Sequence, residues 1–231
     1  MGYADALAIQ RRHQVEVIEA RGGLDPAHGV PSSCRSPGRI LLVEHGPVVT
    51  ITARAGVRDH LLATPELLSS RGVDLCETDR GGDITYHGPG QVVAYPILDL
   101  NLLNLGLHEH MSMMESAVIA ACASFGVQGC RDPAARGVWA RSPTEPGVMA
   151  KVCAMGVRVR RWVSMHGLAL NVSPDMDHFA LIVPCGLAGR PVTSLATIMG
   201  ARCPSVTEVR VELARQLVRE SVVQDAPFFV A

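Results

Sequence analysis

The chain has 231 residues, a formal net charge of −1 and 48% hydrophobic residues. This length and composition predict one globular domain over residues 1–231 with a sizeable buried core, and they exclude a disordered chain. A net charge so close to zero gives no electrostatic reason to expect nucleic acid or a membrane surface as a partner. No apolar run approaches the roughly 18 residues that span a bilayer, and the first residues lack a secretion signal. We therefore expect a cytoplasmic protein.

The cysteines also fit the expectation of a cytoplasmic protein. The seven cysteines stand at irregular spacings and include no Cys-x-x-Cys pair. An odd number without such a pair argues against a disulfide framework and against a zinc ribbon. Most of these residues are expected to be buried, reduced thiols, so a reactive cysteine has to be identified individually.

The first part of the chain predicts a helix, a loop and two strands. Residues 3–20 consist of good helix formers with an apolar stripe, whereas glycines and prolines crowd residues 22–38 and predict a loop. The aliphatic runs 39–43 and 47–51 follow, separated by only three residues. They predict a pair of strands joined by a turn.

A short helix and two further strands are expected next. Thr64 can cap a helix that has a proline at its first position and ends near Gly72. The apolar runs 73–76 and 91–95 then predict strands on either side of a glycine-rich stretch.

The second half predicts two longer helices and an antiparallel strand pair. A helix is expected over 107–125 and a short strand over 137–140. Residues 151–160 and 164–172 predict two paired strands, in which Gly156 permits a bend or a close approach of another group. Ser205 and a glutamate three residues later form a capping box that opens a last helix to about residue 221. This order of elements predicts an α+β fold, a mixed or largely antiparallel sheet with helices on one face.

One segment invites a metal interpretation. His108 and His110 lie two positions apart in the helix 107–125, where side chains at that spacing point away from each other. We expect no metal site here and interpret the segment as a solvated helix start.

The stretch from Arg80 to Gln91 contains four glycines and a proline between two strands. Glycines leave backbone N–H groups unshielded, so such a loop can pass close to a ligand and donate hydrogen bonds to it. The stretch is not a Walker loop or a dinucleotide fingerprint, because neither the Gly-Lys-Ser/Thr sequence nor a helix follows it. A long structural hairpin is the alternative interpretation.

Two residues are candidates for covalent chemistry. Cys185 lies between a proline and a glycine, a corner at which a thiol can be exposed to substrate, although this alone does not separate it from the other cysteines. Lys151 is the only lysine of the chain, which suggests a role that arginine cannot fill, such as proton exchange. A genome that favours arginine codons would explain the count equally well. A lysine beside a cysteine would stabilise the thiolate, whereas Cys76 and Cys153 lie in apparent strands and fit core positions.

Four segments in this order resemble the lipoyl(octanoyl) transferase family, also called lipoate-protein ligase B. The segments are 80–100, Lys151-Val152-Cys153-Ala154-Met155-Gly156, Ser164-Met165-His166-Gly167-Leu168-Ala169-Leu170-Asn171, and Ile182-Val183-Pro184-Cys185-Gly186. The similarity extends over nearly the whole chain. It implies a fold shared with biotin-protein ligases and lipoate-protein ligase A, a mixed sheet flanked by helices.

The resemblance also implies roles for individual residues. Cys185 would form a thioester with the octanoyl group, and Lys151 would lower the pKa of that thiol and transfer protons. The acyl-binding positions of the family correspond to Arg80, Gly81, Gly82, Asp83, Ile84, Thr85, Tyr86, His87, Ala154, Met155, Gly156, Gly167, Leu168 and Ala169.

The implied reaction moves an octanoyl group from octanoyl-acyl carrier protein to a lysine of a lipoyl domain, the first step of endogenous protein lipoylation. The implied acceptors are the lipoyl domains of 2-oxoacid dehydrogenase E2 subunits and the glycine cleavage H protein. A cysteine nucleophile accepts an acyl group that is already activated, so the resemblance implies no ATP, cofactor or metal.

The chain departs from the family pattern at three places. It has Thr50-Ile51-Thr52-Ala53-Arg54 where Thr-x-Gly-Arg is usual, Cys153 where alanine or serine is usual, and a long segment over 22–38. Two other functions remain open at this point. An ATP-dependent lipoate or biotin ligase would require ATP, and a catalytically silent scaffold would bind acyl carrier protein or a lipoyl domain without turnover.

Overall fold

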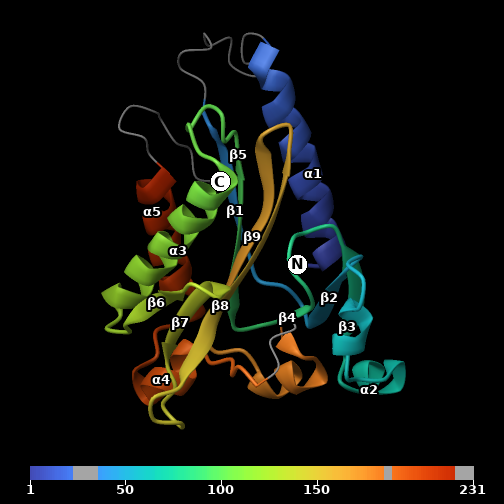
Figure 1. Cartoon of the computed structure of the whole chain (residues 1–231), viewed down its shortest axis with the longest axis vertical. Coiled ribbons are helices and arrows are strands. Elements are labelled where there is room, and N and C mark those ends of the chain that lie inside the picture. The colour runs from blue at the N-terminus through green and yellow to red at the C-terminus, as the bar shows by residue number, and fades with distance from the viewer. Residues whose placement is uncertain (23–35, 185–188, 222–231) are drawn as a thin grey trace.

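The computed structural model describes residues 1–22, 36–184 and 189–221. Its largest element is a six-stranded sheet in the order β1-β5-β9-β8-β7-β6, in which all neighbouring strands are antiparallel (Figure 1). These strands are β1 (Gly38–Val43), β5 (Gln91–Leu98), β6 (Gly129–Asp132), β7 (Ala135–Arg141), β8 (Met149–Arg160) and β9 (Val163–Asn171). The predicted pairing of 151–160 with 164–172 is confirmed.

A second sheet has three strands in the order β3-β2-β4. Its strands are β2 (Val48–Thr52), β3 (Asp74–Thr78) and β4 (Thr85–His87), with β2 parallel to β3 and antiparallel to β4. The prediction that 39–43 pairs with 47–51 is therefore wrong. The two strands contribute side chains to different hydrophobic cores. Ile40 of β1 is buried beneath the helices that cover the large sheet, whereas Val49 and Ile51 of β2 are buried in a separate cluster.

Helices cover both faces of the large sheet, which corrects the expectation of helices on one face. Figure 1 shows α1 (Tyr3–Glu19) on one side, and α3 (Leu107–Ser124) with α5 (Val206–Ser221) on the other. The reason lies in β5, whose residues are all buried. Val92 and Ala94 join the core beneath α3 and α5, while Val93 and Tyr95 join the core beneath α1. Alternate residues of a strand face opposite sides, so a continuous apolar strand needs cover on both.

The remaining helices are short. They are α2 (Pro65–Ser70), α4 (Leu195–Met199), η1 (Ala20–Gly22), η3 (Val57–His60), η4 (Met176–Leu181) and η6 (Gly200–Arg202). The predicted caps are confirmed: Thr64 accepts a hydrogen bond from the backbone of α2, and Ser205 and Glu208 form the capping box of α5. The short β6 and α4 were not predicted.

His110 differs from its prediction. Its neighbour His108 is exposed, but His110 is fully buried on α3 rather than part of a solvated helix start. Among the residues that the structure describes, no group of three or more His, Cys, Asp or Glu side chains could hold a metal ion. No helix in the same ranges is long and apolar enough to cross a membrane.

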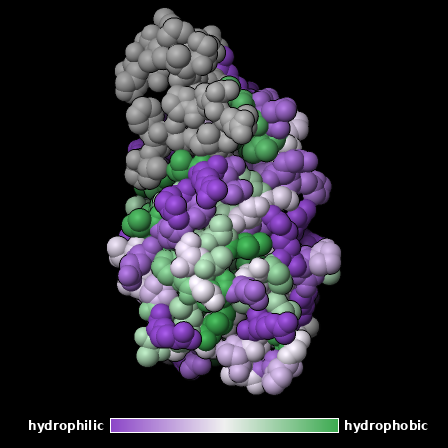
Figure 2. Space-filling view, turned by 90° about the vertical axis from the view of Figure 1, so that its left-hand side faces the viewer, coloured by the Kyte–Doolittle hydropathy of each residue, from purple (hydrophilic) through white to green (hydrophobic). Residues whose placement is uncertain are grey.

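Hydrophilic and hydrophobic side chains are mixed over the described part of the face on which α3 and α5 lie (Figure 2). These helices form a layer whose buried side packs on the large sheet.

The glycine-rich stretch connects the two sheets. The chain leaves β3 in the small sheet, passes over β8, forms β4, and enters β5 in the large sheet, so the hairpin interpretation is wrong. The Gly81 N–H donates to the Val157 carbonyl of β8 at 2.9 Å. A Cβ atom on Gly156 would lie 2.5 Å from the Gly81 oxygen, which confirms the predicted close approach at Gly156.

Candidate active site

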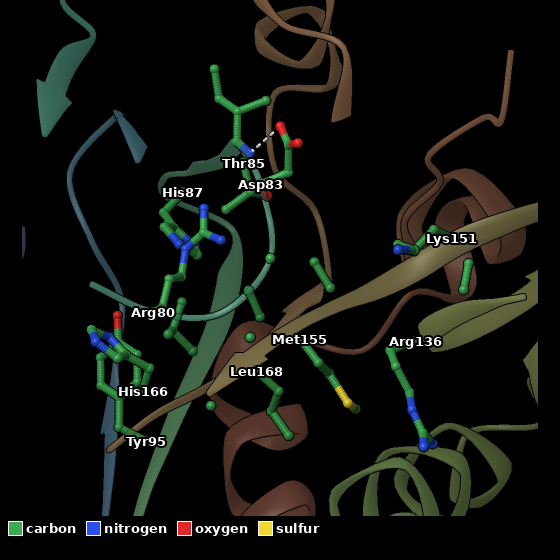
Figure 3. Close-up of a pocket in the computed structure, with 18 of the residues that line it drawn as sticks. Arg80, Asp83, Thr85, His87, Tyr95, Arg136, Lys151, Met155, His166 and Leu168 are labelled. Carbon is green, nitrogen blue, oxygen red and sulfur yellow. Dashed lines mark hydrogen bonds between the residues drawn. The ribbon is translucent and has the colours of Figure 1, made fainter. Parts of the chain in front are cut away.

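A cavity of about 200 Å³ lies between the glycine-rich stretch and strands β8 and β9 (Figure 3). The predicted acyl-binding residues that line it are Arg80, Gly82, Asp83, Ile84, Thr85, His87, Ala154, Met155, Gly156, Gly167, Leu168 and Ala169. Gly81 instead packs on the backbone of β8, and Tyr86 lines a smaller neighbouring cavity.

The register of β8 and β9 explains why two separate predicted segments share one wall. Ala154 lies opposite Ala169, and Met155 lies opposite Leu168. The next pair is Gly156 and Gly167. Ala154, Ala169 and the two glycines leave room beside the sheet. Met155 and Leu168, which pack with the core beneath α3 and α5, add apolar surface to the lining, so the cavity suits an apolar chain.

Lys151 lies in β8 and is 6% exposed. It lines both the large cavity and the smaller one, and Figure 3 shows it well separated from Arg80 and His166, with Met155 and Leu168 between. Its backbone N–H donates to the Pro191 carbonyl at 2.8 Å, and its carbonyl accepts from the Thr193 N–H at 2.9 Å. The main chain of Lys151 is thus fixed, and its side chain lies at one end of a largely apolar cavity.

The other predicted catalytic residue, Cys185, lies outside the described residues. Pro184, which directly precedes it in the chain, lines the smaller cavity together with Lys151. The backbone is fixed just before this point, where the Val183 N–H donates to the His60 carbonyl at 2.8 Å.

A cluster of aromatic rings closes the end of the cavity away from Lys151. Its members are Tyr3 of α1, His45, His87 of β4, Tyr95 of β5 and His166 of β9. Burial lowers the pKa of His87 to about 3 and also lowers the pKa of His45. For His166, burial lowers the pKa by more than the Asp79 carboxylate raises it. The imidazoles are therefore neutral near pH 7. The ring cluster makes this end of the cavity polar but adds no charge to it.

Arg80 and Asp83 are oriented by hydrogen bonds within the glycine-rich stretch and to its neighbours. An Arg80 guanidinium nitrogen donates to both the carbonyl and the hydroxyl of Thr50 at 3.0 Å. One Asp83 carboxylate oxygen accepts from the Ile84 N–H at 2.8 Å and lies 2.7 Å from Nδ1 of His60. Thr50 begins the segment that departs from the family pattern, and Arg54 at its end lines the cavity.

A chain of hydrogen bonds connects the glycine-rich stretch with the lysine strand. Nδ1 of His87 lies 3.2 Å from the Gln91 side-chain oxygen, and the Gln91 amide donates to Asn171 at 2.9 Å. The Asn171 amide donates to the Thr193 carbonyl, also at 2.9 Å. The Thr193 N–H in turn donates to Lys151, so both sides of the cavity share one buried polar network.

Several cavity residues were not predicted from the sequence. They are Tyr3, Arg54, Val93, Tyr95, Ala134, Ala135, Arg136 and His166. His166 directly precedes the predicted Gly167, and this adjacency was a usable signal. Tyr3 reaches the site through the packing of α1 on the sheet.

The arrangement combines a largely apolar cavity, one buried amine and a glycine-rich stretch along one side. Such a cavity can bind an aliphatic chain, and an amine at its end can exchange protons with a group on that chain.

A family model described as the lipoyl protein ligase A/B catalytic domain matches residues 30–218. An octanoyltransferase of Bacteroides fragilis is 46% identical over 180 residues, which cover 78% of this chain and 80% of the relative. An octanoyltransferase of Parabacteroides distasonis is 40% identical over 200 residues, covering 87% and 86% of the two chains. Among solved structures, a bi-partite lipoate protein ligase of Thermoplasma acidophilum superposes with a TM-score of 0.62 at 16% identity, covering 96% of this chain and 83% of that one.

Proposed function

The chain belongs to the lipoyl protein ligase A/B catalytic-domain family and is an octanoyltransferase, and from this premise we propose how it transfers the acyl group. The octanoyl group arrives as a thioester of acyl carrier protein, is held as a thioester of Cys185, and passes to a lysine of a lipoyl domain. The observation that carries the proposal is the position of Lys151, a buried amine at one end of an apolar cavity.

The octanoyl chain occupies the large cavity. Ile84, Met155 and Leu168 supply apolar lining, and each buried methylene of the chain contributes roughly 0.8 kcal/mol to binding. The chain runs from Lys151 toward the ring cluster, so its carboxyl carbon lies near the smaller cavity that Pro184 lines.

In the first step, the Cys185 thiolate attacks the thioester carbon of the donor and forms a new C–S bond. The C–S bond to the phosphopantetheine arm breaks, and the departing sulfur takes a proton from the Lys151 ammonium. Acyl-Cys185, a free carrier thiol and a neutral Lys151 amine result.

In the second step, the neutral amine of the acceptor lysine attacks the acyl carbon. A C–N bond forms and the C–S bond to Cys185 breaks. The proton lost by the attacking nitrogen passes to Lys151, which restores the thiolate and the ammonium. Neither step requires ATP, since the acyl group is activated before it arrives.

We propose lipoyl domains as the acceptors, namely those of 2-oxoacid dehydrogenase E2 subunits and the glycine cleavage H protein. The structure from T. acidophilum pairs a lipoate protein ligase with an E2 lipoyl domain, and this chain shares the ligase fold.

Intact mass after mixing with octanoyl-acyl carrier protein, without ATP, tests the proposal. The wild-type chain is expected to gain one octanoyl group, and Cys185→Ser to gain none as a thioester. Lys151→Ala is expected to acylate at least a hundredfold more slowly, which reflects the usual contribution of a general acid–base group.

An alternative result would overturn the mechanism. If no adduct forms, and a lipoyl domain is modified only once ATP and free octanoate are supplied, the chain acts as an ATP-dependent ligase. If the donor binds without any acyl transfer under either condition, it acts as a scaffold.

A further inference from the structure

Trp139 lies beside Lys151 in a fixed orientation. It is a residue of β7, 1% exposed, and its Cα is the direct cross-strand partner of the Lys151 Cα. The indole N–H donates to the Ala135 carbonyl at 3.0 Å, which fixes the rotation of the ring. The Lys151 ammonium nitrogen lies 4.9 Å from the ring centroid, within the distance of a cation–π interaction.

A second cation lies over the same ring. The guanidinium carbon of Arg190 is 3.8 Å from the Trp139 centroid. The guanidinium also pairs with Asp132, and this hydrogen bond lowers the pKa of the Asp132 carboxyl. Asp132 therefore balances the charge that Arg190 brings close to the Lys151 ammonium.

The backbone reinforces this arrangement. The segment that begins at Arg190 bonds to Lys151 through the Pro191 carbonyl and the Thr193 N–H, and Val192 forms a parallel bridge with Lys151. One segment therefore contacts the Lys151 main chain and, through Arg190, the ring beside the Lys151 side chain.

We propose that Trp139 and Arg190 are positioning residues that hold the Lys151 ammonium where proton transfer takes place. This inference rests on the proposed role of Lys151. A lysine side chain is a flexible four-carbon stem that samples many rotamers. The face of an indole ring attracts the ammonium and favours the rotamers that keep it there, most strongly where water is excluded. Arg190 in turn holds the ring and the segment 190–193 in register with β8.

The inference predicts an effect on rate rather than on donor binding. Trp139 is absent from the described lining of both cavities that Lys151 lines, so its loss should leave acyl binding intact. Proton transfer would slow, because the ammonium would spend less time in the productive position.

The test measures single-turnover octanoylation of Cys185 by intact mass, over a range of octanoyl-acyl carrier protein concentrations. Trp139→Leu is expected to lower the saturating rate about tenfold, equivalent to about 1.4 kcal/mol. The half-saturating donor concentration should change less than twofold. Trp139→Phe keeps an aromatic face and should remain within about threefold of wild type. Trp162→Leu is the matched control, because Trp162 is the only other tryptophan of the chain and is 52% exposed at the β8–β9 turn.

The deciding comparison repeats Trp139→Leu in a Lys151→Ala background. If Trp139 acts through Lys151, its loss has no further effect there, whereas a purely structural effect would multiply with that of Lys151→Ala. Equal effects in both backgrounds, or no effect in either, would overturn the inference. If Trp139→Leu fails to fold, Arg190→Gln is tested in the same two backgrounds. We expect it to lower the saturating rate about threefold when Lys151 is present and to have no effect in the Lys151→Ala background. A loss of rate that persists in the Lys151→Ala background, or no loss in either background, would also overturn the inference.

The proposed mechanism and the positioning role of Trp139 can be disproved separately. If Cys185→Ser and Lys151→Ala acylate as fast as wild type, the proposed mechanism is wrong. If both variants are impaired as proposed but Trp139→Leu behaves like Trp162→Leu, only the positioning inference is wrong.

Discussion

Burial is the largest cause of the lowered pKa values of several histidines in this protein, and for His110 it is the sole cause. His110 is fully buried on α3, and neither ring nitrogen has a hydrogen-bond partner among the described residues. Burial lowers its pKa to about 4, and it lowers that of His87 to about 3. His87 has a place in the proposed site, whereas His110 lies in the helical layer and costs free energy, because a buried polar group without a partner is unfavourable.

We predict that His110→Leu stabilises the chain, and increasingly so at lower pH. The folded pKa lies below the ordinary value of about 6.5, so the unfolded state binds a proton between pH 6.5 and 4 while the folded state does not. Wild-type stability is therefore lost as pH falls through this window, by up to about 1.4 kcal/mol per pH unit. Urea unfolding should show a gain of about 1 kcal/mol at pH 7 and a larger gain at pH 5. His108→Leu, exposed on the same helix, should show neither gain, and a pH-independent difference for His110→Leu would contradict the prediction.

At the scale of elements, the site depends on the close contact between the glycine-rich stretch and β8. The Gly81 N–H donates to Val157 across this contact, and Gly156 has no room for a side chain. Because Gly156 and Gly167 are cross-strand partners at the cavity wall, a shift of the stretch at this point also changes the shape of the cavity.

Gly156→Ala should disturb both stability and catalysis. The added Cβ would lie 2.5 Å from the Gly81 oxygen, so the stretch must move, at a cost of about 1–3 kcal/mol. We expect a lower urea midpoint and at least a tenfold loss of kcat/KM for octanoyl-acyl carrier protein. Gly46→Ala is the control, because a Cβ atom added at Gly46 would meet nothing within 4 Å. A Gly156→Ala variant with wild-type stability and kinetics would show that the contact leaves room for a methyl group.

At the scale of the whole molecule, Asp79 joins parts of the chain that are distant in sequence. Its carboxylate lies 2.8 Å from Nε2 of His166 in β9, pairs with Arg158 of β8, and lies 3.7 Å from Arg11 of α1. Although burial raises the pKa of Asp79, the hydrogen bond from His166 and the two arginine charges bring it below the ordinary value. The helix on one face of the sheet is thereby linked to the strands that form the cavity wall.

Asp79→Asn should weaken this junction. We expect the free energy of unfolding at pH 7 to fall by about 1–2 kcal/mol, since hydrogen bonds to a charged group are lost and part of the site is exposed. The folded pKa lies below the unfolded value, so this contribution is present above about pH 4 and is lost as pH falls through the folded pKa. Urea titrations should therefore show the gap between wild type and variant closing below pH 4. Asp74→Asn, exposed on β3, is the comparison; an equal loss there would indicate a general charge effect.

Local sequence signals predicted most elements because the interactions behind them are local. The capping box of Ser205 and Glu208 and the cap at Thr64 involve residues three positions apart, and both were found. The pairing of residues 39–43 with 47–51 was wrong, because strand pairing depends on which core each strand buries and not on the length of the connection. Of the candidate site, the glycine-rich stretch and Lys151 were identified, whereas Tyr3 and Tyr95 were not, since rings in regular elements carry no local mark of function.

The sequence by itself determined the type of most elements, the family and the candidate residues, because periodicity, caps, glycines and motif order are properties of neighbouring residues. Only the tertiary structure decided that helices cover both faces of the sheet, that the glycine-rich stretch connects two sheets, and that Trp139 lies beside Lys151. These features arise from contacts between distant parts of the chain, such as the hydrogen bond from the His166 N–H to Gln10, 156 positions away. Such contacts form only once the strands are aligned, and their alignment is set by how the whole chain buries its apolar residues.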